Sequence, residues 1–243
     1  MPKYKTHTIA DTTEFVAFIC KNCKPDDTLF RGQPVDEPLW PKLARLDFKT
    51  PVLDAEQKMI REFKRRSLPL LDVQPKSSWD WLAIAQHHGM ATRLLDWTLN
   101  PLAALWFAVS RPPEKKNGRP RDAVVWVLAP KPSDYAVASA RVSPFKIGKT
   151  MIYRPRHVAP RLVNQAGWFT AHKFMKTENR FIALERNKAY SVKLTKLIIP
   201  HRSFPDMRFD LDRFNVNAST LFPDVDGLCT HIQWLHTFLK DEK

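Results

Sequence analysis

The sequence predicts an α+β fold: a single domain over residues 1–243, in which helices pack on small mixed sheets. Three observations predict it. First, 44% of the 243 residues are hydrophobic, which is typical of a globular chain that buries its own core. Second, segments with helical periodicity and short apolar strand-like segments both occur. Third, the two kinds do not alternate regularly, as they would in repeated βαβ units.

The N-terminal half is predicted to contain four helices and one strand. Ser77 and Asp80 form a capping box, and Asn100 or Thr98 can cap a helix whose first turn holds Pro101. In order, the expected elements are a helix capped by Thr12 or Thr13, a strand in "DTLFRGQP" stopped by Gly32 and Pro34, and helices in "DAEQKMIREFKRRS", in "SSWDWLAIAQHHG" and from Pro101 onward.

The C-terminal half mixes strands, helices and irregular segments. Residues 111–121 are rich in Pro, Gly and Asn and are predicted to be a loop, and residues 130–160 show little periodicity. The last helix follows "LFPDVDG", with Leu228, Ile232, Leu235 and Leu239 on one apolar face. The other expected elements are strands in "AVVWVLA", "RLVNQAGWFTAH" and "SVKLTKLIIP" and a short helix in "PDMRFDLDRFNV".

Charge is the strongest global signal in the sequence. There are 39 Lys and Arg against 25 Asp and Glu, which gives a net charge of +14 and attracts polyanions. Nucleic acid is the expected partner, although such basic runs also occur as solvated loops. The candidate phosphate contacts lie in two segments: Lys115, Lys116, Arg119, Arg121, Lys146, Lys149, Arg154 and Arg156.

Several classes of protein are not expected. No apolar run approaches the roughly 18 residues of a membrane span, and the N-terminus lacks the apolar segment of a signal peptide, so we expect a cytoplasmic protein without a membrane partner. The glycines fit neither a Rossmann fingerprint nor a P-loop, and no serine-hydrolase elbow or zincin motif occurs. Cys20 with Cys23 and Cys229 with His231 could bind zinc, but their spacing is unusual and we expect no metal.

The segment "RLLDWT" gathers charge, an aromatic ring and a hydroxyl in a way that core packing does not require. We expect Asp96, Trp97 and Thr98 at the rim of a ligand pocket whose floor is the following helix. The alternative is a structural ion pair between Arg93 and Asp96 that braces the turn. Arg31 should reach the same pocket from its strand.

Four motifs resemble one family. They are "LFRGQ" (29–33), "WLAIAQHHGMATRLLDWTLNPLAALWFA" (81–108), "NQAGWFTAH" (164–172) and "LFPDVDGL" (221–228), and they look like the FRG domain, named after its Phe-Arg-Gly motif. The family occurs widely in bacteria and phages. The resemblance spans residues 28–230.

A more distant resemblance is to the arginine-type ADP-ribosyltransferases. In those enzymes an arginine followed by glycine anchors NAD, as Arg31 would here, and a strand ending in Ser or Thr precedes a helix with "A-x-x-F-A", as at Thr98. Gln165 stands where they keep a catalytic glutamate, so Asp96 or Glu178 would have to supply the carboxylate that stabilises positive charge on the ribose.

These resemblances imply an NAD-dependent ADP-ribosyltransferase-like enzyme that modifies a nucleic acid in a toxin or phage-defence role. The alternative is a non-catalytic nucleotide or nucleic-acid binding module of a defence system. A partner protein such as an antitoxin fits either one. The expected catalytic residues are Arg31, Asp96 and Gln165, and the expected NAD-binding residues are Arg31, Gln33, Gln86, His87, Arg93, Trp97, Thr98 and Thr170.

Overall fold

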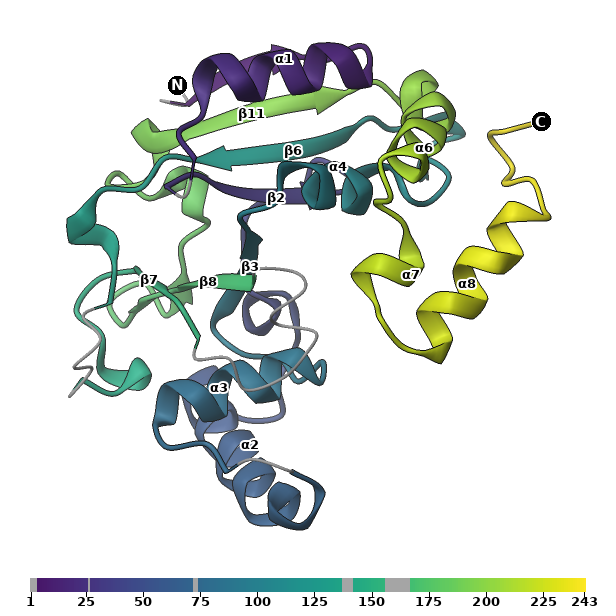
Figure 1. The fold of residues 1–243 in the computed structure, drawn as a ribbon. Coiled ribbons are helices and arrows are strands. Elements are labelled where there is room, and N and C mark those ends of the chain that lie inside the picture. Colours follow the sequence, from purple (N-terminus) through teal and green to yellow (C-terminus); the bar gives the residue numbers. More distant parts are fainter. Residues whose placement is uncertain (1–3, 26, 72–73, 137–141, 156–166) are drawn as a thin grey trace.

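The computed structural model describes residues 4–25, 27–71, 74–136, 142–155 and 167–243, and it confirms the α+β class (Figure 1). The main sheet has seven strands in the order β1-β11-β6-β2-β3-β8-β7. It is mixed, because β1 runs parallel to β11 whereas the other neighbours are antiparallel. Its strands are β1 (Lys5–Thr8), β2 (Leu29–Gln33), β3 (Leu94–Thr98), β6 (Ala123–Leu128), β7 (Met151–Tyr153), β8 (Gly167–Ala171) and β11 (Leu194–Ile199).

The sheet is divided at a seam between β2 and β3. These two strands are joined at a single pair of residues, Phe30 and Thr98. On either side of the seam the strands pair over more residues: β2 pairs with β6, and β3 pairs with β8, along the full length of β2 and of β3. Figure 1 shows β3, β7 and β8 lying below the plane of β11, β6 and β2. Backbone and side chains on both sides of the seam can therefore face a common space.

Three helices cover one face of the upper part of the sheet. They are α1 (Thr12–Asn22), α4 (Pro101–Val109) and α6 (Phe204–Arg213), and they share a core with Phe30 and Leu197. The cap of α1 differs from the prediction: Asp11, not Thr12 or Thr13, accepts the hydrogen bond from the amide of Glu14. Asn100 caps α4, as predicted, by accepting from the amides of Leu102 and Ala103.

The strand β2 lies unusually close to α4. A Cβ atom on Gly32 would lie 1.8 Å from the carbonyl oxygen of Ala104, and 2.8 Å from the amide nitrogen of Ala108. Gly32 therefore does not stop the strand, as predicted, but sits inside it. Its missing side chain, with the small residues of α4, lets strand and helix touch backbone to backbone.

The lower part of the sheet packs against α2 (Val52–Ser67) and α3 (Ser78–His87). Their shared core includes Ile60, Trp79 and Phe169. The predicted capping box is present, since Ser77 accepts from the amide of Asp80 and Asp80 accepts from the amide of Ser77. The last turn of α3, which holds Gln86 and His87, lies at the seam.

Two segments differ from the sequence prediction. Residues 111–121 are not a plain loop: β4 (Lys115–Lys116) and β5 (Arg119–Pro120) form a small hairpin. Asn117 and Gly118 make its turn with φ angles of 52° and 77°, as two-residue hairpins require. The predicted irregular region contains the strand β7. A second small sheet pairs β9 (Phe174–Met175) with β10 (Arg180–Phe181).

The C-terminal helices α7 (Ala218–Leu221) and α8 (Val225–Leu235) lie at one end of the molecule (Figure 1). The apolar face predicted for the last helix exists, but it does not face the core: Leu228, Ile232 and Leu235 are each about half exposed, at 49%, 47% and 54%. In the part of the chain that the structure describes, no helix is long and apolar enough to cross a membrane.

Candidate ligand-binding site

A cavity of about 500 Å³ opens at the seam between β2 and β3. Strand β2 contributes Arg31, strand β3 contributes Asp96, and the last turn of α3 contributes Gln86 and His87. The helix α4 forms one wall. Strand β2 thus meets the consecutive elements α3, β3 and α4 where the sheet is split.

Arg31 is the buried cation of this cavity. Its side chain is 17% exposed; Nη1 donates to the backbone oxygen of Asp96 at 2.9 Å and lies 3.7 Å from the Asp96 carboxylate. Burial lowers the pKa of the guanidinium, and the Asp96 charge opposes that shift. Its Nε is buried and has no hydrogen-bond partner among the described residues. A buried donor without an acceptor suits an anionic or polar ligand.

Asp96 is held in place by Gln86. The Gln86 amide nitrogen donates to both carboxylate oxygens at 3.3 and 3.1 Å, while its oxygen accepts from the Thr92 hydroxyl at 2.7 Å. The Thr92 contact fixes which end of the amide faces Asp96. The Asp96 side chain remains 56% exposed, so a ligand in the cavity can reach it.

The indole of Trp97 is braced from behind by a chain of hydrogen bonds. Trp97 Nε1 donates to Thr170 Oγ1 at 3.1 Å, which lies 3.2 Å from His172 Nε2. Burial, with smaller contributions from Arg31 and Arg93, lowers the pKa of His172 to about 4. The neutral ring therefore donates from Nδ1 to the Ile182 oxygen and accepts from Thr170, so every donor in the chain points the same way.

Aromatic side chains form most of the remaining wall. Phe30, Trp97, Trp168 and Phe169 come from the sheet, and the other rings are Trp106, Phe107 and Phe222. Trp168 also carries the guanidinium of Arg154 over its ring at 5.3 Å. Aromatic rings beside a cation and a carboxylate are typical of sites that bind flat, charged organic molecules.

The expectation that Arg31 and Asp96 share a cavity at "RLLDWT" is confirmed. The predicted residues His87, Trp97 and Thr98 line it as well. The Thr98 hydroxyl accepts from the amide of Asn100 and so also braces the start of α4. Gln165 lies outside the described residues. The functional roles of all these residues stay predictions.

Three residues predicted to bind the ligand do not line the cavity. Arg93 is 2% exposed and pairs with Glu56, not with Asp96, so the alternative of an Arg93–Asp96 ion pair is wrong too. Gln33 accepts from Trp126 Nε1 at 2.9 Å within the core. Thr170 is fully buried behind Trp97. The side chains of all three residues are buried in the core, and the sequence pattern did not reveal this orientation.

Other lining residues escaped the sequence analysis. Trp106 and Phe107 lie on the helix that was expected to form the floor of the pocket, but neither was named as a site residue. Arg111 adds a second cation to the lining. Phe222 belongs to the motif "LFPDVDGL", and its presence there was the one signal that could have placed this segment at the site.

The predicted phosphate contacts are scattered. Lys115, Lys116 and Arg119 are exposed on the hairpin, and Lys146 is exposed as well. Arg121 is tied to Glu37 at 3.1 Å, and Lys149 Nζ donates to the Ser133 oxygen at 2.7 Å. Arg156 lies outside the described residues.

A second cavity gathers lysines that the sequence analysis mostly missed. Its volume is about 580 Å³, and the five lysines that line it are Lys131, Lys149, Lys173, Lys188 and Lys193. The carboxylate of Asp134 is already neutralised by Lys193, at 2.6 and 2.7 Å. The ammonium groups of Lys131, Lys173 and Lys188 have no partner among the described residues. The cavity is therefore strongly cationic.

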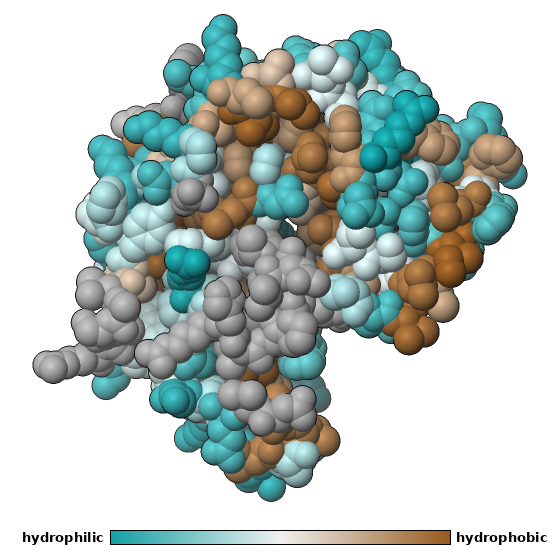
Figure 2. Space-filling view, viewed as in Figure 1, coloured by the Kyte–Doolittle hydropathy of each residue, from teal (hydrophilic) through white to brown (hydrophobic). Residues whose placement is uncertain are grey.

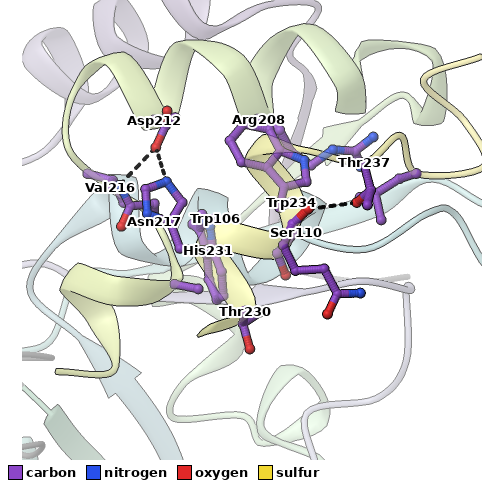
Figure 3. A pocket seen from close by; sticks show the side chains of 13 residues that line it. Trp106, Ser110, Arg208, Asp212, Val216, Asn217, Thr230, His231, Trp234 and Thr237 are labelled. Atoms are coloured by element: carbon purple, nitrogen blue, oxygen red, sulfur yellow. Dashed lines mark hydrogen bonds and ion pairs between the residues drawn. The ribbon is translucent and has the colours of Figure 1, made fainter. Parts of the chain in front are cut away.

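A third cavity, of about 210 Å³, lies between α4, α6 and α8 (Figure 3). Some of its polar groups satisfy one another: Asp212 accepts from Asn217 Nδ2 at 2.8 Å and lies 2.8 Å from His231 Nε2. His231, weighed above as a zinc ligand, is thus engaged by Asp212. No group of three or more His, Cys, Asp or Glu that could hold a metal occurs among the described residues.

The fold and the cavity define this chain as an α+β protein with a cationic, aromatic-walled candidate site at the seam of a split sheet. Residues 26–117 match the model of the FRG domain family, and Phe30, Arg31 and Gly32 lie in the matched stretch. The motifs at 164–172 and 221–228 lie outside it. No curated protein and no solved structure matches the chain.

Proposed function

We propose that the seam cavity binds NAD and that the protein is an ADP-ribosyltransferase-like enzyme. The observation that supports this most is the Arg31–Asp96 pair: a buried guanidinium with an unpartnered donor beside an accessible carboxylate, within aromatic walls. A dinucleotide needs a cation for its phosphates, hydrogen-bonding groups for its ribose and flat apolar surfaces for its rings. All three are present in the one cavity.

In this proposal each residue has one task. Arg31 binds phosphate or ribose oxygens, and its Nε is the free donor. Asp96, oriented by Gln86, stabilises the positive charge that builds on the ribose as the bond to nicotinamide breaks. Trp97 or His87 lies against the nicotinamide ring, and Thr98 lies beside the ribose. Asp96 then supplies the carboxylate that the transferases take from a glutamate, because this chain has Gln165 at the glutamate position.

The acceptor in this proposal is a nucleic acid. The net charge of +14 and the lysine-lined cavity support it, since Lys131, Lys173 and Lys188 line that cavity without an ion-pair partner among the described residues. The exposed lysines of the hairpin would extend the contact. Modification of nucleic acid is an activity suited to a toxin or a phage-defence protein, with an antitoxin as its natural regulator.

A second candidate is a binding module that holds a nucleotide or a nucleic-acid end without chemistry. The uncharged Gln165 at the glutamate position favours it, because an amide neither carries charge nor acts as a general base. The two candidates share the cavity and differ only in whether nicotinamide is released. One assay therefore separates them.

Arg31→Ala is expected to weaken NAD binding about 10- to 100-fold, because a charge-assisted hydrogen bond contributes about 1.5–3 kcal/mol. Isothermal titration with NAD measures the loss, and the melting temperature is recorded in parallel. The matched control is Arg121→Ala, which removes a paired arginine outside the cavity and should leave binding unchanged. Equal losses of binding in both variants would contradict the assignment of the site.

Asp96→Asn distinguishes enzyme from module in the same experiment. It keeps the shape and the Gln86 contact but removes the charge, so an enzyme should keep NAD binding and lose nicotinamide release in the presence of DNA or RNA. If the wild-type chain binds NAD and releases no nicotinamide with either acceptor, the binding module is correct. If it does not bind NAD at all, both proposals for this ligand fail.

Binding of nucleic acid should fall steeply with salt. Lys173→Ala combined with Lys188→Ala is expected to reduce the slope of log K against log salt by up to about 2, since each duplex phosphate contact contributes about 0.9. Fluorescence anisotropy with a DNA duplex and with RNA measures it. The control pair, Lys21→Ala with Lys24→Ala, removes the same charge from exposed positions near the end of α1. An unchanged slope in the cavity variant would exclude this surface.

A further inference from the structure

The helix α8 is amphipathic, but its apolar side faces outward. We define the α8 stripe as Val225, Leu228, Ile232, Leu235 and Phe238, whose exposed fractions are 74%, 49%, 47%, 54% and 70%. The first four lie on one side of the helix, because they are spaced by three or four residues, and Phe238 follows just beyond its end. Figure 2 shows hydrophobic residues gathered along this helix at the edge of the molecule.

The other side of α8, with Gly227, His231 and Trp234, is fixed to the protein. A Cβ atom on Gly227 would lie 2.0 Å from the Phe222 oxygen, so the first turn of the helix is in close contact with the preceding segment. His231 reaches Asp212 on α6 (Figure 3), and Trp234 Nε1 donates to Glu242 at 3.2 Å. The helix cannot rotate to bury the stripe without losing all three contacts.

An exposed stripe of this size is unusual for a chain that acts alone. Single exposed apolar residues are common, but a contiguous row of five large ones marks an interaction surface. On α6, Phe209 is also 47% exposed, and its ring centroid lies 5.4 Å from that of Trp234. A partner surface that covered this row would remove apolar area from water, which is favourable.

The spacing of the stripe favours a second copy of the same helix. Val225 and Ile232 are seven residues apart, and Leu228 and Leu235 follow each of them by three. β-Branched residues at the first position of a heptad and leucine at the fourth favour two parallel helices. Helices arranged in this way present identical stripes to each other, which is the geometry of a two-fold dimer.

Charge does not oppose this pairing. The chain carries a net charge of +14, yet the segment Val225–Leu235 has only one charged residue, Asp226. Asp226 follows the first heptad position and so lies beside the stripe, not in it. Two copies can therefore bring their stripes together without bringing the basic surfaces together.

We propose that the α8 stripe pairs with the α8 stripe of a second copy of this chain to form a two-fold dimer. Each copy contributes the same five side chains, and the polar side of each helix stays on its own protein. The inference is independent of what the seam cavity binds.

The test is the mass of the purified chain by sedimentation equilibrium from low to high micromolar concentration. The wild type should form a dimer, and Ile232→Glu should raise the dimer dissociation constant at least about 10-fold, because it places a charge in the centre of the stripe. Leu70→Glu and Val192→Glu are the controls: these residues are 80% and 60% exposed, lie away from α8, and should leave the dimer intact.

Because the substituted residues are exposed, all three variants should keep the circular dichroism spectrum and melting temperature of the wild type. Leu228→Cys, in a chain whose native cysteines are replaced by serine, should form a disulfide-linked dimer on mild oxidation if the helices are parallel. A wild type that stays monomeric at every concentration would overturn the proposal and leave the stripe to a different protein. A dimer that resists Ile232→Glu would equally overturn it.

Discussion

Gly32→Ala is expected to destabilise the protein by more than about 3 kcal/mol, and the variant should fail to accumulate in folded form. The new Cβ would lie 1.8 Å from the Ala104 carbonyl oxygen, a distance that real Cβ atoms do not show. Because the opposing atom belongs to the backbone of α4, no side chain can move aside. Overpacking a core costs about 1–3 kcal/mol where side chains can adjust, and a backbone clash exceeds that range.

Urea denaturation of the purified variants measures the effect. Gly148→Ala is the matched control, since a Cβ there meets no atom within 4 Å and the backbone is not left-handed. It should be as stable as the wild type. Near-native stability of Gly32→Ala would show that β2 and α4 are not in backbone contact. Because Arg31 precedes this residue, any surviving folded protein should also bind ligand more weakly.

Glu56→Ala is expected to cost about 3–5 kcal/mol, because it leaves the Arg93 guanidinium buried without a counter-charge. Glu56 and Arg93 are 2% and 3% exposed at their side chains, and Arg93 Nε donates to Glu56 at 2.9 and 3.1 Å. The pair connects α2 to the residue before β3. Its loss should loosen the strand that carries Asp96, as well as lower the free energy of unfolding measured in urea.

Two further variants test whether the loss of stability in Glu56→Ala comes from the unpaired charge of Arg93. Glu62→Ala breaks an exposed cluster with Arg65 and Arg66 on the same helix and should leave stability nearly unchanged. The double variant Glu56→Met with Arg93→Met removes both charges and should be more stable than Glu56→Ala. If Glu56→Ala and Glu62→Ala were equally mild, the pair would not be buried in solution.

Much of the fold could be predicted from residue pattern. The Ser77–Asp80 box and the Asn100 cap located α3 and α4, because helix ends leave backbone donors that only particular side chains satisfy. The apolar run at 123–128 located β6, whose residues are all buried. Such signals are local, and the sequence contains them in full.

The pairing of the strands could not be predicted in this way. Nothing in "LFRGQ" or "LLDWT" indicates that their strands meet at one residue pair and then part. Gly32 was interpreted as a strand end because its real constraint lies 72 positions away, at Ala104. The outward orientation of α8 is similar: its periodicity defined the stripe, but only the contacts of its other side determine which way the stripe faces.

The site shows the same division. The sequence by itself determined which polar and aromatic groups are candidates for a site, because a guanidinium, a carboxylate and an indole in the two matched motifs are visible without a structure. The tertiary structure decided which of them meet: Arg31, Asp96 and Trp97 do, whereas Arg93 pairs with Glu56 in the core. The physical reason is that a residue's type is local, whereas its burial and its partner depend on segments brought together only by folding.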